Sequence, residues 1–105
     1  MKAIGYTQSL AIENKDSLQD IELDQPIATG RDVLVKVKAI AVNPVDTKIR
    51  NNVAPPAGEY KVIGWDAVGE IVATGEQAST FAIGDSVYYA GALSRAGSNA
   101  QYQLV

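Results

Sequence analysis

The sequence predicts a mainly β domain, a barrel or sandwich built from short strands. Three observations predict this class. Short runs of alternating apolar and β-branched residues recur along the whole chain. Turn segments containing glycine or proline separate these runs. The length of 105 residues, with 47% hydrophobic and 20% charged residues, suits one globular domain with its own core.

The clearest alternation runs over residues 32–42. One set of side chains, from Val33 to Ala41, is small and apolar, whereas Lys36 and Lys38 place charges on the other side in mid-strand. We therefore expect the first set to face a core and the second to be partly in water. Similar runs predict five further strands, at residues 2–6, 18–23, 68–73, 86–90 and 100–105.

The connecting segments carry turn residues. Residues 26–31 contain proline and glycine, and residues 74–76 follow a strand directly. Phe81 is expected to be buried, and Gly84 to take a positive φ in the turn before the next strand.

One long segment, residues 43–62, shows little strand pattern and carries three prolines. Residues 45–50 within it could form one or two helical turns, with Pro44 near the first helical position. Because long irregular loops in small domains are often functional, we expect any site to lie here.

Composition and charge exclude several classes of function. The net charge is −3, and no stripe of lysine or arginine is present, so neither nucleic acid nor an anionic membrane is expected as a partner. The chain has no cysteine and no histidine, which removes disulfides, thiolate nucleophiles, imidazole bases and nearly every transition-metal site. The first residues lack the apolar region of a signal peptide, and no stretch approaches a spanning helix, so a cytoplasmic location is expected.

Three motifs occur in order: NPVDTK at residues 43–48, GWDAVGEIV at 64–72 and FAIGDSV at 81–87. Together they resemble the medium-chain dehydrogenase/reductase superfamily, and most closely its zinc-independent quinone oxidoreductase-like branch, often named zinc-type alcohol dehydrogenase-like. The resemblance covers almost the whole chain. It implies that residues 1–105 form a GroES-like (chaperonin-10-like), partly open β-barrel with short helical segments, the N-terminal catalytic domain of such an enzyme.

The same resemblance has implications for zinc binding and for the cofactor. Zinc-dependent members carry a cysteine where this chain has Asn43 and a histidine where it has Trp65. An amide and an indole do not replace a thiolate and an imidazole as zinc ligands, so zinc catalysis is not expected. In the zinc-free branch, NADPH delivers hydride to a quinone or an activated enone, and the protein supplies position and polarity.

Site residues follow from the resemblance position by position. It implies Asn43 and Asp46 as catalytic residues and Asn43 with Lys48 as cofactor contacts. The implied substrate pocket comprises Trp65, Tyr60 and Tyr89, and the implied structural residues are Asp66, Gly64, Gly69 and Gly84.

Simpler interpretations of these residues stay open. Asn43 before Pro44 is commonly a turn residue or helix cap, and Asp46 could form only local hydrogen bonds. Lys48 and Arg50 could be ordinary solvated charges. A lone tryptophan at the entrance of a strand is more often core than pocket, which is the alternative for Trp65.

The glycine-rich phosphate-binding fingerprint of the superfamily does not occur in residues 1–105. We therefore expect a fragment that lacks the nucleotide-binding (Rossmann) domain and is inactive alone. NADPH is expected to bind only to the full-length protein, which could also form a homodimer. The alternative is a non-enzymatic GroES-like binding module, or one similar to a co-chaperonin. The natural substrate, and the choice between NADPH and NADH, stay open.

Overall fold

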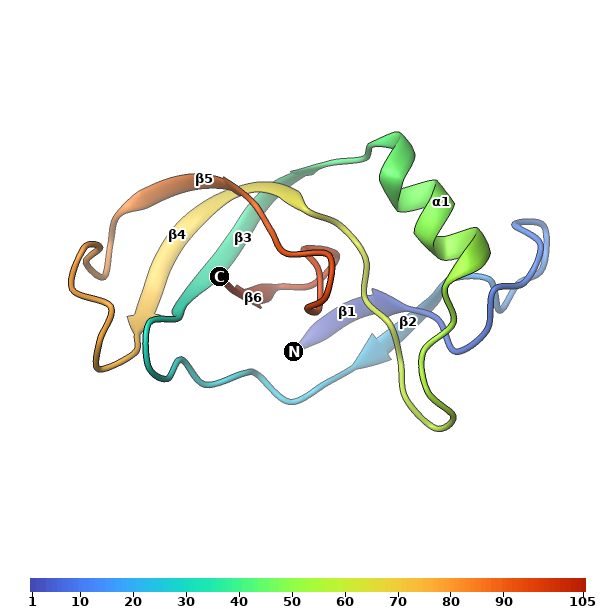
Figure 1. The fold of residues 1–105 in the computed structure, drawn as a ribbon, viewed down its shortest axis with the longest axis horizontal. Coiled ribbons are helices and arrows are strands. Elements are labelled where there is room, and N and C mark those ends of the chain that lie inside the picture. Colours follow the sequence, from blue (N-terminus) through green and yellow to red (C-terminus); the bar gives the residue numbers. More distant parts are fainter.

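A computed structural model describes all residues, 1–105, as six strands and one helix (Figure 1). The elements are β1 Lys2–Gly5, β2 Gln19–Glu22, β3 Val33–Ala41, α1 Pro44–Asn52, β4 Asp66–Thr74, β5 Ser86–Ala90 and β6 Tyr102–Leu104.

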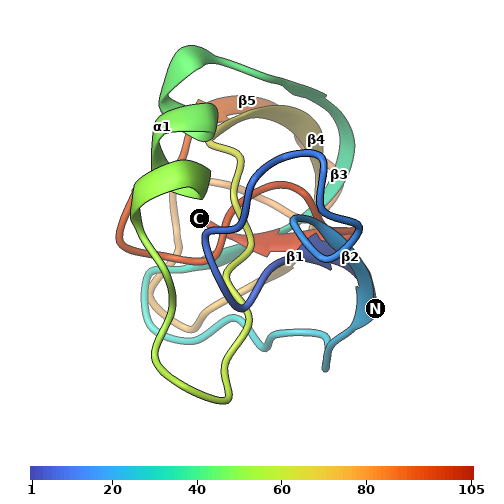
Figure 2. The ribbon, with the colours of Figure 1, turned by 90° about the vertical axis from the view of Figure 1, so that its right-hand side faces the viewer.

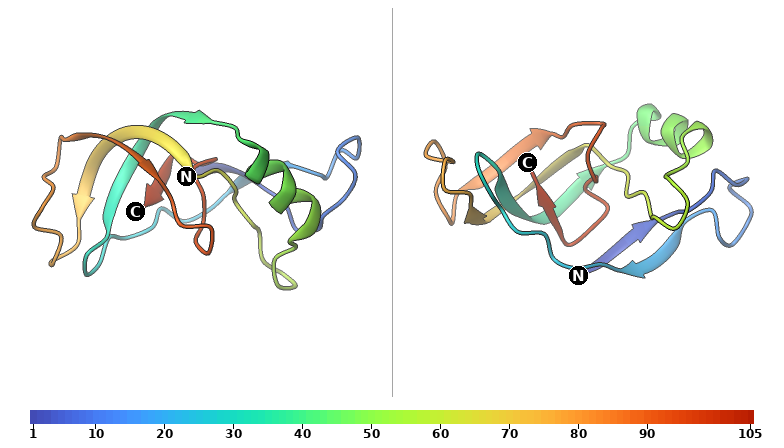
Figure 3. Two further views of the ribbon diagram at one scale, coloured as in Figure 1. Left: turned by 45° about the horizontal axis from the view of Figure 1, so that its top comes forward. Right: turned by 60° about the horizontal axis from the view of Figure 1, so that its bottom comes forward.

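The strands form two antiparallel sheets that do not close completely. β1 pairs with β2, and the other four strands lie in the order β5-β4-β3-β6. Helix α1 lies at the end of the molecule opposite the β4–β5 turn (Figures 1 and 3). The arrangement confirms the prediction of a mainly β, partly open barrel. The one helix, α1, has nine residues and is too short to span a membrane.

The two sheets are joined by residues that come from the two ends of the chain. Ala3 forms an isolated antiparallel bridge with Ala100. The Ile4 N–H donates to the Asn99 carbonyl at 2.8 Å, and the N–H of residue 101 donates to the carbonyl of residue 2 at 3.0 Å. Viewed along the long axis, the chain therefore runs round a central region that contains β6 (Figure 2).

The core consists of two small clusters rather than one. The first joins Tyr6, Ile63 and Trp65 beside α1. The second joins three aliphatic residues on the inner face of the larger sheet: Val33, Val35 and Ile71. Each cluster stabilises one end of the elongated domain, because burial of apolar surface is the main favourable contribution to folding.

All six predicted strands form, most with bounds shifted by one or two residues. The helix is longer than residues 45–50, because it begins at Pro44 and ends at Asn52. Its first turn contains a proline at a favoured position, and its last turn is held from outside by the Tyr6 hydroxyl, which donates to the Val53 carbonyl at 2.6 Å. The residue pattern near the helix cannot predict this tertiary hydrogen bond, because Tyr6 is far away in the sequence.

Two expectations about burial are wrong. The apolar set of β3 was expected to face the core throughout, but Ala39 and Ala41 are exposed. A register irregularity interrupts the pairing after Val37, and β6 covers only the first part of β3. Phe81 is 50% exposed rather than buried. It precedes a tight turn in which the Ala82 N–H donates to the Asp85 carboxylate at 2.9 Å, at the open end of the sheet.

Candidate functional site

The candidate site lies where β3 ends, α1 begins and β4 starts. Ala41, the last residue of β3, is paired in register with Asp66, the first residue of β4. Asn43 follows two residues after Ala41 as the residue before the helix, in an extended conformation. Its side-chain Nδ2 donates to Asp66 Oδ2 at 2.5 Å. The sheet register thus brings together two of the residues expected from sequence, one of them assigned as catalytic and one as structural.

Asp46 is held in the first turn of α1 and is only 4% exposed. Its Oδ2 accepts the backbone N–H of Asn43 at 2.8 Å. A carboxylate in this position also interacts favourably with the positive end of the helix dipole. The structure therefore gives Asp46 the local hydrogen-bonding role, in which it anchors the backbone of Asn43.

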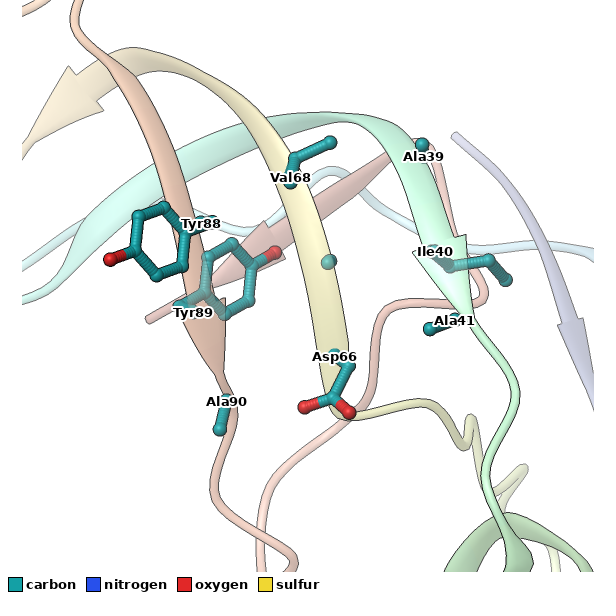
Figure 4. Close-up of a pocket in the computed structure, with 9 residues that line it drawn as sticks. Ala39, Ile40, Ala41, Asp66, Val68, Tyr88, Tyr89 and Ala90 are labelled. Atoms are coloured by element: carbon teal, nitrogen blue, oxygen red, sulfur yellow. The ribbon is translucent and has the colours of Figure 1, made fainter.

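An apolar depression of about 530 Å³ lies beside Asp66, on the sheet formed by β3, β4 and β5 (Figure 4). Eight of its nine lining residues are hydrophobic, and Asp66 is the only charged one. Tyr89, assigned from sequence to the substrate pocket, is among the lining residues with Tyr88 and Val68. Such a surface suits a flat, uncharged molecule.

Tyr89 differs from an ordinary exposed phenol. Its hydroxyl donates to Gln103 Oε1 at 2.7 Å, and the Gln103 amide in turn donates to the Ala96 carbonyl at 3.3 Å. Burial raises the pKa of Tyr89 to about 12. Tyr89 is therefore a neutral, positioned side chain at physiological pH.

Trp65 does not line the depression. It is 4% exposed, packs with Tyr6 and Ile63, and donates its Nε1–H to the Ala92 carbonyl at 3.0 Å. This is the packing alternative for Trp65 rather than the pocket assignment. Tyr60 is half exposed in the segment between α1 and β4 and does not line the depression either.

Lys48 lies exposed on α1, and no ion pair holds it. It is one helical turn from the helix start.

The three glycines assigned as structural occupy different settings. Gly64 has a φ of +105°, and an added Cβ would meet Asn99 Oδ1 at 2.7 Å. Gly69 lies so close to the neighbouring strand that a Cβ would meet the Lys36 carbonyl. Gly84 has a φ of +96° in the turn before β5. A larger residue at Gly69 would force the backbones of β3 and β4 apart, and one at Gly64 would clash with Ser98 and Asn99.

Sequence reasoning missed the buried state of Arg50. Its side chain lies in the interior and donates to the Leu10 carbonyl at 2.7 Å and to the Asn51 side chain. Arg50 therefore ties the last turn of α1 to the loop after β1, and it is not a solvated charge. Its spacing of four from Asp46, on the same helix face, is the one signal in the sequence for an inward orientation.

The donor atoms at this place do not fit a catalytic zinc ion. The structure contains no group of three or more histidine, cysteine, aspartate or glutamate side chains placed to hold a metal. At the site itself, Asn43 presents an amide, Trp65 is turned into the core, and Asp66 is the one exposed carboxylate. Zinc in proteins takes thiolate, imidazole or carboxylate ligands, usually three or four of them.

The fold is that of a GroES-like β domain. The alcohol dehydrogenase GroES-like domain model matches residues 29–104, and the chain belongs to that family, within the medium-chain dehydrogenase/reductase superfamily. A Staphylococcus epidermidis zinc-type alcohol dehydrogenase-like protein is 43% identical over the whole chain, which spans 31% of that relative.

Two solved structures are similar to the whole of this chain. A Rhizobium etli protein described as a zinc-dependent alcohol dehydrogenase is 48% identical, with a TM-score of 0.96 over all of this chain and 30% of its own. The quinone oxidoreductase of Coxiella burnetii is 28% identical, with a TM-score of 0.83 over all of this chain and 34% of its own. The chain therefore spans about a third of the length of these relatives.

Proposed function

We propose that this chain is the N-terminal substrate domain of an NADPH-dependent quinone or enone oxidoreductase that transfers hydride without zinc, and that it is inactive alone. One observation carries the proposal. Beside a large apolar depression, the chain presents the carboxamide of Asn43, held by Asp66, at the position where zinc-dependent members carry a cysteine. The likeness to a quinone oxidoreductase structure supports it.

The chemistry follows from the acceptor. NADPH, when bound, would supply the hydride. Quinones and activated enones are electrophilic enough to accept it without a Lewis acid, provided that the acceptor is correctly placed and its developing oxyanion receives a hydrogen bond. The apolar surface with Tyr89 would hold the flat acceptor and exclude water, and the Asn43 carboxamide would offer hydrogen-bonding groups beside it.

The residues present fit only part of NADPH. Asn43 and Lys48 are the groups that could contact its nicotinamide end or a phosphate, and residues 1–105 contain no glycine-rich turn between a strand and a helix to bind the pyrophosphate. We infer that a nucleotide-binding domain in a longer gene product supplies the rest.

The test is NADPH-dependent reduction of phenanthrenequinone by the full-length gene product and by this chain, each with and without EDTA. We expect chelator-resistant activity in the longer protein only. Activity abolished by the chelator and restored by zinc would contradict the zinc-free mechanism. No activity in either protein would favour the GroES-like binding module instead.

A matched pair of variants tests the role of Asn43. In the full-length protein, Asn43→Ala should lower kcat/KM on the order of a hundredfold, the usual cost of losing a hydrogen-bond donor at a developing oxyanion. Asn52→Ala, at the other end of the same helix, removes a side chain that bonds only the Lys48 carbonyl and should change kcat/KM less than about twofold. Thermal unfolding of both variants separates lost activity from lost folding.

A further inference from the structure

We propose that Asp66 is a positioning residue that fixes which way the Asn43 carboxamide points. The inference rests on the proposed function, in which this carboxamide faces the nicotinamide and the acceptor. The two residues are 23 positions apart in sequence, and the antiparallel register between β3 and β4 places them side by side.

Asn43 is held by two carboxylates with separate roles. Asp46 accepts the backbone N–H of Asn43 at 2.8 Å and so fixes the main chain at the helix start. Asp66 accepts the side-chain Nδ2 and so fixes the carboxamide. Asp66 takes part in none of the three ion pairs of the structure, so no cation competes with the amide for its charge.

The charge of Asp66 favours one flip of the amide, the flip that also leaves the Asn43 oxygen toward the backbone N–H of Asp46 in the capping box. An ionised carboxylate only accepts hydrogen bonds, whereas a carboxamide has a donor end and an acceptor end of nearly equal size. Turning Oδ1 of Asn43 toward Asp66 would place two acceptors in contact, which is repulsive. Because the amide is planar, directing Nδ2 to Asp66 also sets the direction of Oδ1 and of the second N–H.

A neutral partner would lose this selection. In Asp66→Asn the new amide can accept from Asn43 or donate to it, so both flips of Asn43 are compatible with a hydrogen bond. The ligand would then meet a mixture of donor and acceptor ends. Asp66→Glu keeps the charge one methylene further out and should restore the selection in part.

The first experiment observes the amide without relying on activity. In side-chain ¹H–¹⁵N spectra of this chain, we expect one Nδ2 proton of Asn43 to lie downfield of free asparagine amides. Asp66→Asn should remove this displacement. Glu70→Gln, which removes another carboxylate from the same strand, should leave the Asn43 signals unchanged. Asn43 signals at the free-amide position, unaltered in Asp66→Asn, would overturn the inference.

The second experiment uses the full-length protein and phenanthrenequinone. Asp66→Asn should lower kcat about tenfold, because a misdirected contact costs transition-state stabilisation, while Asp66→Glu recovers part of the loss and Glu70→Gln stays near the unsubstituted value. If the unsubstituted protein is active and Asp66→Asn leaves kcat unchanged, the positioning role is overturned but the proposed function is not. Absence of reductase activity in the unsubstituted protein would overturn the proposed function, and this inference with it.

Discussion

The two ends of β3 lie in different environments although their residues are alike. Val33 to Val35 at the first end are buried, and Val35 is fully enclosed in a cluster with Val33 and Ile71. At the other end Ile40 is 43% exposed, and the apolar surface continues openly onto β4 and β5. The first end stabilises the domain, and the second carries the candidate site. Similar apolar residues thus form part of a core or of an open surface according to what covers them.

The largest expected effect is a difference in stability between a buried and an exposed position of β4. Ile71→Ala opens a cavity against Val33 and Val35, and should lower the free energy of unfolding by about 3 kcal/mol. Val68→Ala, three residues earlier on the exposed side, should cost less than about 0.5 kcal/mol. Urea unfolding of both variants measures the difference. Equal costs would show that the open end is packed as tightly as the buried one.

An intermediate loss of stability is expected at the end of the domain that contains α1 and the candidate site. Tyr6→Phe keeps the enclosed ring but removes the hydroxyl that donates to the Val53 and Ile49 carbonyls at the end of α1. We expect a loss of about 1 to 2 kcal/mol, with faster amide exchange in the last turn of the helix. Tyr88→Phe is the control, because that side chain is 87% exposed. Similar values for both variants would contradict the anchoring role of Tyr6.

The smallest expected effect is a loss of stability that depends on the ionisation of Tyr89, and it occurs only in alkali. Burial raises the pKa of Tyr89 to about 12, whereas an unfolded tyrosine titrates near 10. The folded state therefore favours the neutral phenol. The associated stability is complete below about pH 10 and is lost as the pH rises toward 12. Absorbance titration at 295 nm should show this late ionisation in the unsubstituted chain and its loss in Tyr89→Phe. An unchanged curve would place the late ionisation elsewhere.

Much of the fold could be predicted from sequence because strand alternation and turn residues are local signals. The strand at residues 86–90 matches the predicted bounds for this reason. Burial was less predictable, since Ala39 and Phe81 depend on whether another segment covers them. The length of α1 was also out of reach, because Tyr6 holds its end from far away in the chain.

The candidate site was predicted in outline only. The motifs identified Asn43 and Asp46 as site residues and Asp66 as a structural one, but the bond from Asn43 to Asp66 depends on the register of Ala41 opposite Asp66. The inward orientation of Trp65 depends on Tyr6 and Ile63, which no pattern near residue 65 reveals.

The joint between the two sheets has a consequence for synthesis on the ribosome. β1 is the first strand to emerge, yet three of its hydrogen bonds outside β2 are with Asn99 and Gln101, almost a hundred residues later. The barrel therefore cannot close while the chain is still short, and the N-terminal strand must wait, with one edge open, until about a hundred residues have been made. A chain that stops before residue 101 holds an unfinished barrel, whereas the barrel can close once residues 99–101 have left the ribosome.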